Sequence, residues 1–330
     1  MFSRRFVLAA TLAAFVAPAL ARPALADDGK LPVVASFSIL GDFVKEVGGD
    51  RVDVTTIIGP NGDSHVYQPT PADAKKLSDA KLIFVNGLGF EGWVERLAKA
   101  SGTKAPIIVA TKGITPRKGS DDEHHHEDHD GHDHADHDDD HDHDQHKHEG
   151  HHHHGGLDPH AWQSVSNAKI YIANIRDALI AADPAGKATY TTNAAAYDAR
   201  LDALDAEVKQ AISTIPADHR RIITSHDAFG YFADTYGVAF ISPEGVSTES
   251  EASAKDVARI IRQIKEDKIP AVFIENVSDP RLMERIAKET GAKVGGALYS
   301  DALSDDKGPA NTYIELIRFN TKALTNALAQ

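Results

Sequence analysis

One segment of this 330-residue chain has almost no side chain that could enter a hydrophobic core, and it divides the sequence into two parts. Residues 121–154 read DDEHHHEDHDGHDHADHDDDHDHDQHKHEGHHHH and hold 15 of the 19 histidines. They also hold 11 Asp, 3 Glu and one Lys, so the segment has a net charge of −14 + 1 = −13, against −14 for the whole chain. Ala135 is its one aliphatic side chain. We therefore expect the segment to be disordered in the absence of metal.

The side chains of this segment suit transition metals, because imidazole and carboxylate groups are ligands for Zn²⁺, Ni²⁺ and Cu²⁺. A solvated acidic linker does not need fifteen imidazoles, and a purification tag does not explain a longest run, His151–His154, in mid-chain. We predict low-affinity, auxiliary metal binding. Its ligands would be His124, His125, His126, His129, His132, His134, His137, His141, His143, His146, His148, His151, His152, His153 and His154.

The N-terminus has the pattern of an export signal. Ser3-Arg4-Arg5 supplies positive charge, residues 6–20 are apolar but too few to span a bilayer, and Ala24-Leu25-Ala26 is an A-x-A cleavage site. We expect the mature chain to begin at Asp27. A twin-arginine signal and an ordinary secretory signal both fit, and an uncleaved anchor helix is the less favoured alternative.

Composition narrows the class of protein further. The chain has no cysteine, which excludes disulfides, thiolate metal ligands and a lipidated cysteine, so we expect a free protein in a compartment such as the periplasm. About 270 residues remain outside the signal and the histidine-rich segment, enough for two domains. These residues are near charge balance, which argues against nucleic-acid binding. No further apolar run reaches the roughly 18 residues of a membrane-spanning helix.

Strand and helix patterns alternate on both sides of the histidine-rich segment. Before it we expect strands at 33–40, 52–58, 82–85 and 106–110, and helices at 42–47, 71–79 and 91–100. After it we expect helices at 164–182, 187–214, 228–236, 253–266, 280–290 and 311–328, and strands at 221–224, 238–241, 271–275 and 293–299. Such alternation indicates parallel sheets covered by helices. The helix at 187–214 would be roughly 40 Å long, enough to connect two lobes.

The predicted fold class is therefore α/β, with two lobes that each hold a parallel sheet flanked by helices and are joined by one long helix. The expected division is a signal peptide at 1–26 and an N-terminal lobe at 27–160 that includes a disordered His/Asp-rich loop at 113–156. Linking helices follow at 161–215, and a C-terminal lobe at 216–330.

Four residues stand where ligand sites of α/β proteins occur. His65 and His160 lie in loops of the first half, while His226 and Asp301 directly follow predicted strands of the second half. Ligands bind at the carboxyl ends of parallel strands, so a site built from both halves would lie in the cleft between the lobes. The residues share no local spacing such as H-x-x-x-H, and a single histidine is more often a capping or core residue. His219, in a polar run, fits a surface position.

The chain resembles the periplasmic solute-binding proteins of zinc and manganese ABC importers, known as cluster A-I. The matching segments are GDSHVYQPTP at 62–71, LDPHAW at 157–162, TSHDAFGYF at 224–232, FIEN at 273–276 and YSDALS at 299–304. A histidine-rich acidic loop just before the D-P-H segment is typical of the zinc branch. The resemblance runs from about residue 31 to the C-terminus, and it implies two α/β lobes, a rigid linking helix and a buried metal site.

Carried over residue by residue, the resemblance implies that His65, His160, His226 and Asp301 hold the metal. Manganese-selective relatives look as if they carry Glu at the position of His226, and only part of the zinc branch uses the carboxylate that corresponds to Asp301. Three imidazoles and one carboxylate complete a tetrahedral site that suits Zn²⁺, whereas Mn²⁺ prefers more oxygen ligands. Asp158, Asp227 and Glu275 are candidates to orient the imidazoles.

The leading hypothesis is a high-affinity zinc-binding protein, without enzymatic activity, that captures Zn²⁺ in the periplasm and delivers it to the membrane subunit of an ABC permease. We expect a monomer, with a periplasmic zinc chaperone as a further candidate partner. Ligand type alone also admits copper and nickel. Two alternatives stay open. An exported zinc hydrolase would need a free metal position and a general base, and a metal-storage or adhesion protein would use the histidine-rich segment alone.

Overall fold

The computed structural model describes residues 29–119, 156–249 and 251–329. The expected signal peptide and all fifteen auxiliary histidines lie outside the described residues. The predicted disorder of residues 120–155, and their metal binding, therefore stay predictions. The limits of the disordered loop expected at 113–156 were wrong at the start, because residues 113–119 are described and include a strand at Arg117–Lys118. Within the described part of the chain, no helix is both long and apolar enough to cross a membrane.

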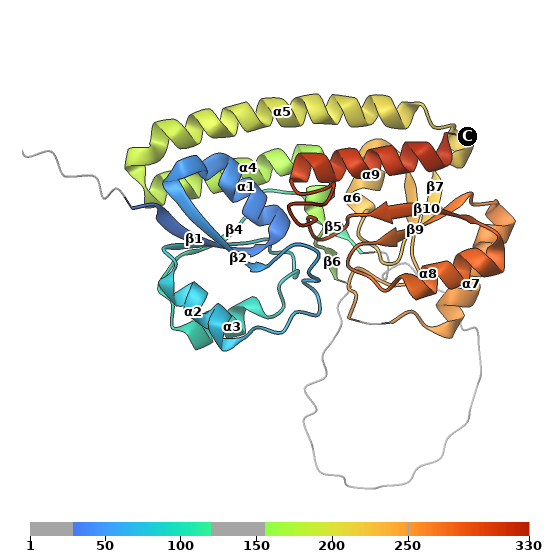
Figure 1. Ribbon diagram of the computed structural model, residues 1–330, viewed down its shortest axis with the longest axis horizontal. Helices are drawn as coiled ribbons and strands as arrows, with labels where there is room; N and C mark the ends of the chain where they lie inside the picture. The colour runs from blue at the N-terminus through green and yellow to red at the C-terminus, as the bar shows by residue number, and fades with distance from the viewer. Residues whose placement is uncertain (1–28, 120–155, 250, 330) are drawn as a thin grey trace, which may run out of the picture.

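Two four-stranded parallel sheets form the centres of two lobes in the described residues, which confirms the predicted fold class (Figure 1). The first sheet has the order β2-β1-β3-β4, with β1 at Leu31–Phe37, β2 at Val52–Ile58, β3 at Leu82–Val85 and β4 at Ile107–Val109. The second has the order β10-β9-β7-β8, with β7 at Arg221–Ile223, β8 at Ala239–Ile241, β9 at Ala271–Glu275 and β10 at Lys293–Leu298. The strands are rich in β-branched and aromatic residues, which favour a buried sheet.

Helices cover both sheets. Those next to the first sheet are α1 (Ser38–Gly48), α2 (Pro71–Asp79) and α3 (Val94–Ser101), and those next to the second are α6 (Gly230–Tyr236), α7 (Ala254–Asp267), α8 (Pro280–Thr290) and α9 (Tyr313–Leu328). Helix α4 (Val165–Ala182) and helix α5 (Lys187–Ser213) join the lobes, and α5 runs along both of them (Figure 1).

Helix α5 contributes to a hydrophobic core that the two lobes share. Its buried residues recur every three or four positions from Tyr190 to Ile212, so one stripe faces inward. This stripe packs against α1 and α4 on one side and α9 on the other. One continuous hydrophobic core therefore includes Phe43 of the first lobe and Phe273 and Tyr313 of the second. The limits 27–160, 161–215 and 216–330 remain our proposed division of this chain.

Most element boundaries lie within two residues of the sequence prediction, and the larger differences occur at two places. The strand expected at 33–40 ends at Phe37, and Ser38 begins helix α1. Both the strand and the first helical turn are buried, so the apolar run has no periodicity that marks the change. The helix expected from Glu91 begins at Val94, because the Glu91 carboxylate accepts hydrogen bonds from Asn86 N (2.6 Å), Gly87 N (3.1 Å) and the Ser36 hydroxyl (2.6 Å).

A short antiparallel ladder that the sequence did not predict joins the two ends of the histidine-rich segment. Strand β5 (Arg117–Lys118) pairs with β6 (Leu157–Asp158), and Arg117 lies opposite Asp158. The Gly119 N–H then donates to the Gly156 carbonyl at 3.0 Å. Strands of two residues carry no hydrophobic period, which is why pattern analysis missed them. Gly119 and Gly156, which border the gap in the described chain, are therefore neighbours in space.

We expect Thr70→Ala to lower the free energy of unfolding by about 1 kcal/mol, because Thr70 caps helix α2 directly after the His65 loop. Thr70 and Asp73 form a reciprocal capping box, in which Asp73 Oδ2 accepts the Thr70 N–H at 2.9 Å. Urea denaturation followed by circular dichroism measures the change. Ser78→Ala is the control, because this exposed hydroxyl of the same helix donates only to Lys75 O and to Asp79. Equal losses in the two variants would contradict the prediction.

Candidate metal centre

The structure brings together the four residues that the sequence singled out. His65 follows β2 through a loop, His160 follows β6, His226 follows β7, and Asp301 follows β10. One potential ligand atom from each residue lies within 4.8 Å of the others. His160, His226 and Asp301 are fully buried, and the His65 side chain is 6% exposed. The four side chains therefore meet in a closed space between the two lobes.

The polar atoms of this group converge on one point. His65 Nε2 lies 3.3 Å from His160 Nε2 and 3.3 Å from Asp301 Oδ2. Asp301 Oδ2 lies 3.2 Å from His226 Nε2, and Asp301 Oδ1 lies 3.5 Å from His160 Nε2. The oxygens of Asp301 nevertheless have no hydrogen bond of good geometry to the described residues. Such convergence of buried donors is the arrangement that a central cation requires.

Carboxylates hold two of the three imidazoles from behind. Asp158 Oδ1 lies 2.8 Å from His160 Nδ1 and accepts the His160 backbone N–H at 2.9 Å. Glu275 Oε2 lies 2.6 Å from His226 Nδ1, while its Oε1 accepts the backbone N–H groups of Ser225 (2.7 Å) and His226 (3.0 Å). A carboxylate behind Nδ1 keeps the proton there and leaves Nε2 free to bind a metal.

Asp158 and Glu275 thus stand behind ligand imidazoles, as two of the three expected orienting residues. The described contacts of the third, Asp227, are different: its backbone N–H donates to the Gly245 carbonyl at 2.9 Å, and its charge acts on Arg117.

Contacts within its own lobe hold His65, and a residue of the opposite lobe supports them. The His65 ring packs edge-on against Phe90, with ring centroids 5.0 Å apart, and the His65 backbone N–H donates to Asp63 Oδ1 at 2.8 Å. The Thr248 hydroxyl of the second lobe donates to the other oxygen of Asp63 at 2.6 Å. The sequence analysis missed both Asp63 and Thr248, because a hydrogen bond across 185 positions leaves no local pattern.

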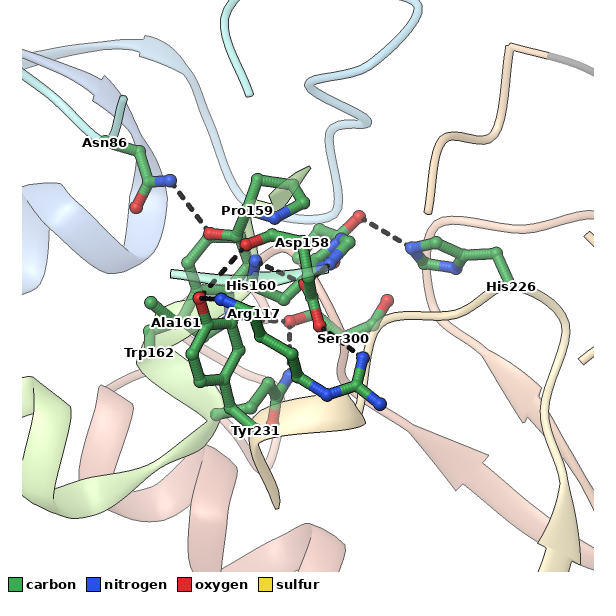
Figure 2. A network of polar contacts seen from close by, with 12 residues as sticks. Asn86, Arg117, Asp158, Pro159, His160, Ala161, Trp162, His226, Tyr231 and Ser300 are labelled. Carbon is green, nitrogen blue, oxygen red and sulfur yellow. Dashed lines mark hydrogen bonds and ion pairs between the residues drawn. The ribbon is translucent and has the colours of Figure 1, made fainter. Parts of the chain in front are cut away.

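The turn after His160 positions Asp301. Residues Ala161–Gln163 form a short 3₁₀ helix, and the side chains of Trp162 and Gln163 both donate to the Ser300 carbonyl, at 2.9 and 2.8 Å (Figure 2). The backbone directly before Asp301 thus accepts hydrogen bonds from side chains two and three positions after His160. These hydrogen bonds therefore connect the segment of His160, in the first lobe, to the segment of Asp301, in the second.

Charge in the site is strongly coupled. Burial alone would lower the pKa of His226, but the carboxylates of Glu275 and Asp301 raise it well above its usual value of 6.5. Burial would raise the pKa of Asp301, but the imidazoles of His226, His160 and His65 hold it well below its usual value. In the metal-free protein, these shifts favour a protonated His226 beside an ionised Asp301.

A surface cavity of about 860 Å³ opens beside His65. Its lining includes Tyr67, Trp93, Arg96 and Glu249, from the His65 loop, the start of α3 and the second lobe. Tyr67 and Trp93 pack edge to face, with centroids 5.5 Å apart, and Trp93 Nε1 donates to the Ser64 carbonyl at 3.3 Å. The aromatic wall of this cavity therefore supports the backbone that carries His65.

The comparisons with known proteins agree on one family. Residues 33–327 match the family model described as zinc-uptake complex component A, periplasmic. The iron-binding protein YfeA of Yersinia pestis is 37% identical over 91% of this chain and 87% of its own length. The Mn-bound periplasmic metal-binding protein of Candidatus Liberibacter asiaticus has a TM-score of 0.74 and 32% identity, over 90% of this chain and 99% of its own. The periplasmic zinc-binding protein TroA of Treponema pallidum has a TM-score of 0.77 and 27% identity, over 92% and 100%.

We expect metal binding in the cleft to release protons at pH 8, because the metal needs the unprotonated Nε2 of a histidine whose pKa is raised well above 6.5. Ordinary imidazoles are already neutral at this pH and release none. The affinity should therefore increase with pH until His226 is neutral. Isothermal titration in two buffers with different ionisation enthalpies measures the released protons, and identical apparent enthalpies in both buffers would contradict this expectation.

Proposed function

Because this chain belongs to the family of zinc-uptake complex component A, we propose that it captures Zn²⁺ in the periplasm and delivers it to the membrane permease of an ABC importer. The chain is a metal-binding solute-binding protein of this transporter class. The choice of zinc and the periplasmic location are the parts that we propose. So are the four ligands, His65, His160, His226 and Asp301.

The spacing of the ligand atoms carries this proposal. A tetrahedron with metal–ligand bonds of about 2.0–2.1 Å has edges of about 3.3–3.4 Å. The pairs formed by His65 Nε2 with His160 Nε2, His65 Nε2 with Asp301 Oδ2, and His226 Nε2 with Asp301 Oδ2 are 3.3, 3.3 and 3.2 Å apart. These three of the six edges fit a zinc ion bound by three imidazoles and one carboxylate oxygen, and the other ligand-atom pairs lie within 4.8 Å.

We propose that the chain is not an enzyme, because four protein ligands leave no position for a reacting water on a tetrahedral zinc. A hydrolase would also need a free general base. Glu275 stands behind His226, and Asp158 stands behind His160, so their carboxylates are already occupied in orienting imidazoles. This argues for capture and release of the ion rather than for chemistry on a second substrate.

Manganese or iron is the second candidate cargo. Asp301 presents both oxygens to the imidazoles, with Oδ1 3.5 Å from His160 Nε2 and Oδ2 3.2 Å from His226 Nε2. If both oxygens bound the ion, the site would have five ligands, and Mn²⁺ favours more oxygen ligands than Zn²⁺ does. Relatives named for iron and for manganese share this fold. His226, an imidazole rather than a carboxylate, favours zinc.

The histidine-rich segment would serve as a low-affinity collector that passes zinc to the cleft. We propose that the protein acts as a monomer and docks on the membrane subunit of the permease, with a periplasmic zinc chaperone as a further partner. Buffering of metal by the segment alone, without a tight site, is the storage alternative that the experiments below separate from import.

We expect the wild-type protein to bind one Zn²⁺ tightly in competition with a chelator that removes metal from weak sites, and to prefer Zn²⁺ to Mn²⁺. His226→Ala should abolish the tight site, because it removes one of four ligands and leaves Glu275 buried beside a cavity. His219→Ala is the control, since this histidine contacts the Leu328 carbonyl and is outside the proposed ligand set. Tight binding that survives His226→Ala, or a preference for Mn²⁺, would refute the zinc assignment.

Deletion of residues 121–154 should lower the total zinc stoichiometry and leave the one tight site unchanged. The deletion joins Ser120 to Gly155, and the Gly119–Gly156 hydrogen bond already holds these ends together, so a short turn can close the β5–β6 ladder. Metal content and chelator competition, compared with the full chain, measure both quantities. Loss of tight binding on deletion would show that the histidine-rich segment, and not the cleft, is the zinc site.

A further inference from the structure

Arg117 is an ionised group next to the metal centre that the proposed function has not used. Its Nη1 donates to Asp158 Oδ2 at 3.2 Å, and the other oxygen of Asp158 faces His160 Nδ1 at 2.8 Å. Asp158 is fully buried, whereas the Arg117 side chain is 28% exposed. The arginine thus reaches from near the surface to the carboxylate behind a proposed metal ligand (Figure 2).

The β5–β6 ladder fixes the position of Arg117. The register places it opposite Asp158, so the two side chains belong to one cross-strand pair. The Tyr231 hydroxyl accepts the Arg117 backbone N–H at 2.9 Å and donates to the Asp158 carbonyl at 3.3 Å. A single tyrosine of the second lobe therefore bridges both strands.

Helix α6 leaves space for the guanidinium at its first residue. A Cβ added to Gly230 would lie 2.2 Å from Nη1 and 2.4 Å from Cζ of Arg117, and 2.7 Å from Asp158 Oδ2. Any side chain at this position would occupy the space that the ion pair fills. The absence of a side chain at residue 230 is thus part of how Arg117 reaches Asp158.

Arg117 also balances the charge of a carboxylate that has no other cation against it in the described contacts. Asp158 accepts the N–H groups of His160 on Oδ1, and Arg117 occupies Oδ2. Burying a carboxylate without a partner costs several kcal/mol, so its orientation depends on the cation that faces it. Asp234, 65% exposed, binds the same guanidinium through Nε at 3.2 Å on the outer side.

We propose that Arg117 is a positioning residue of the metal site: it holds Asp158 so that His160 presents an unprotonated Nε2 to the metal. The inference rests on the proposed function only in that His160 is a ligand. It links the metal centre to the histidine-rich segment, because the strand that carries Arg117 lies just before this segment in the chain. The competing explanation is a brace, in which Arg117 only attaches the ladder to helix α6 through Asp234.

Four variants separate these explanations, with Zn²⁺ affinity measured by chelator competition. Arg117→Met keeps an unbranched aliphatic side chain of similar bulk up to the δ position and removes the charged guanidinium, and it should weaken zinc binding by about tenfold, the lower end of the usual loss when a residue behind a metal ligand is removed. Arg117→Lys should recover part of that loss. Gly230→Ala should weaken binding as well, because it displaces the guanidinium without changing Arg117 or Asp158. Asp234→Asn removes the outer ion pair alone and should bind zinc as the wild type does.

A spectroscopic readout excludes a purely structural effect. With one equivalent of Co²⁺ in place of Zn²⁺, the d–d absorption of the tight site should change in Arg117→Met and Gly230→Ala and should be unchanged in Asp234→Asn. Wild-type affinity and a wild-type cobalt spectrum in both Arg117→Met and Gly230→Ala would overturn the proposal. An equal loss in Asp234→Asn would do so too, in favour of the brace. If Arg117→Met fails to fold, Arg117→Lys, Gly230→Ala and Asp234→Asn decide by the same criteria.

A failure of the Arg117 proposal can be distinguished from a failure of the zinc assignment. The zinc assignment fails if the wild-type protein has no tight zinc that His226→Ala removes. In that case the same four variants are read with Mn²⁺, because any ion held by His160 requires the same orientation of its ring. The Arg117 proposal then stands or falls on the Mn²⁺ affinities.

Discussion

The balance of buried charge is the constraint on which this structure depends. Asp158, Glu275 and Asp301 are each at most 1% exposed and surround one small group of imidazoles. Arg117 compensates Asp158, which leaves the charges of Glu275 and Asp301 beside His226. Two unbalanced carboxylates in a closed space are costly. A divalent cation restores neutrality, and a proton on His226 does so in part when the cation is absent, which is why the pKa of His226 is raised.

Hydrogen bonds around the site fix a loop within the second lobe and join the two halves of the chain. Glu275 ends strand β9 and accepts the backbone N–H groups of Ser225 and His226, so it fixes the loop after the neighbouring strand β7 while it orients a ligand. The Ser300 carbonyl accepts hydrogen bonds from Trp162 and Gln163 of the other half of the chain. These hydrogen bonds between protein groups hold the frame around His160, His226 and Asp301. His65 differs, since a loop carries it and Asp63 and Thr248 hold that loop across the lobes.

Much of this organisation could be predicted from the sequence, and the failures have physical causes. Strands such as β2 and β9 and helices such as α2 and α8 were predicted to the residue, because Pro, capping residues and β-branched runs mark their limits. The ladder β5–β6 was missed because it is stabilised by pairing across the histidine-rich segment and by Tyr231, not by local propensity.

The site residues show the same division between local and non-local information. Family motifs indicated four residues that the fold then brings together, and whether they bind metal stays a prediction. Of the three residues expected to orient the imidazoles, Asp158 and Glu275 lie behind His160 and His226. Arg117, Asp63 and Thr248 could not be found this way, because each acts through a partner that is remote in the sequence. Sequence patterns identify the proposed metal ligands more readily than they identify the residues that position those ligands.

Metal preference cannot lie in the fold, because relatives named for iron, manganese and zinc share it. It must lie in the donor atoms. Glu275 behind His226 and Asp158 behind His160 make both imidazoles stronger donors, which favours an ion that binds nitrogen in a four-coordinate site. An ion that needs more ligands would have to use the second oxygen of Asp301, which faces His160 at 3.5 Å. A tetrahedral ion would need only one of these oxygens, and three of its six edges match distances between the four side chains.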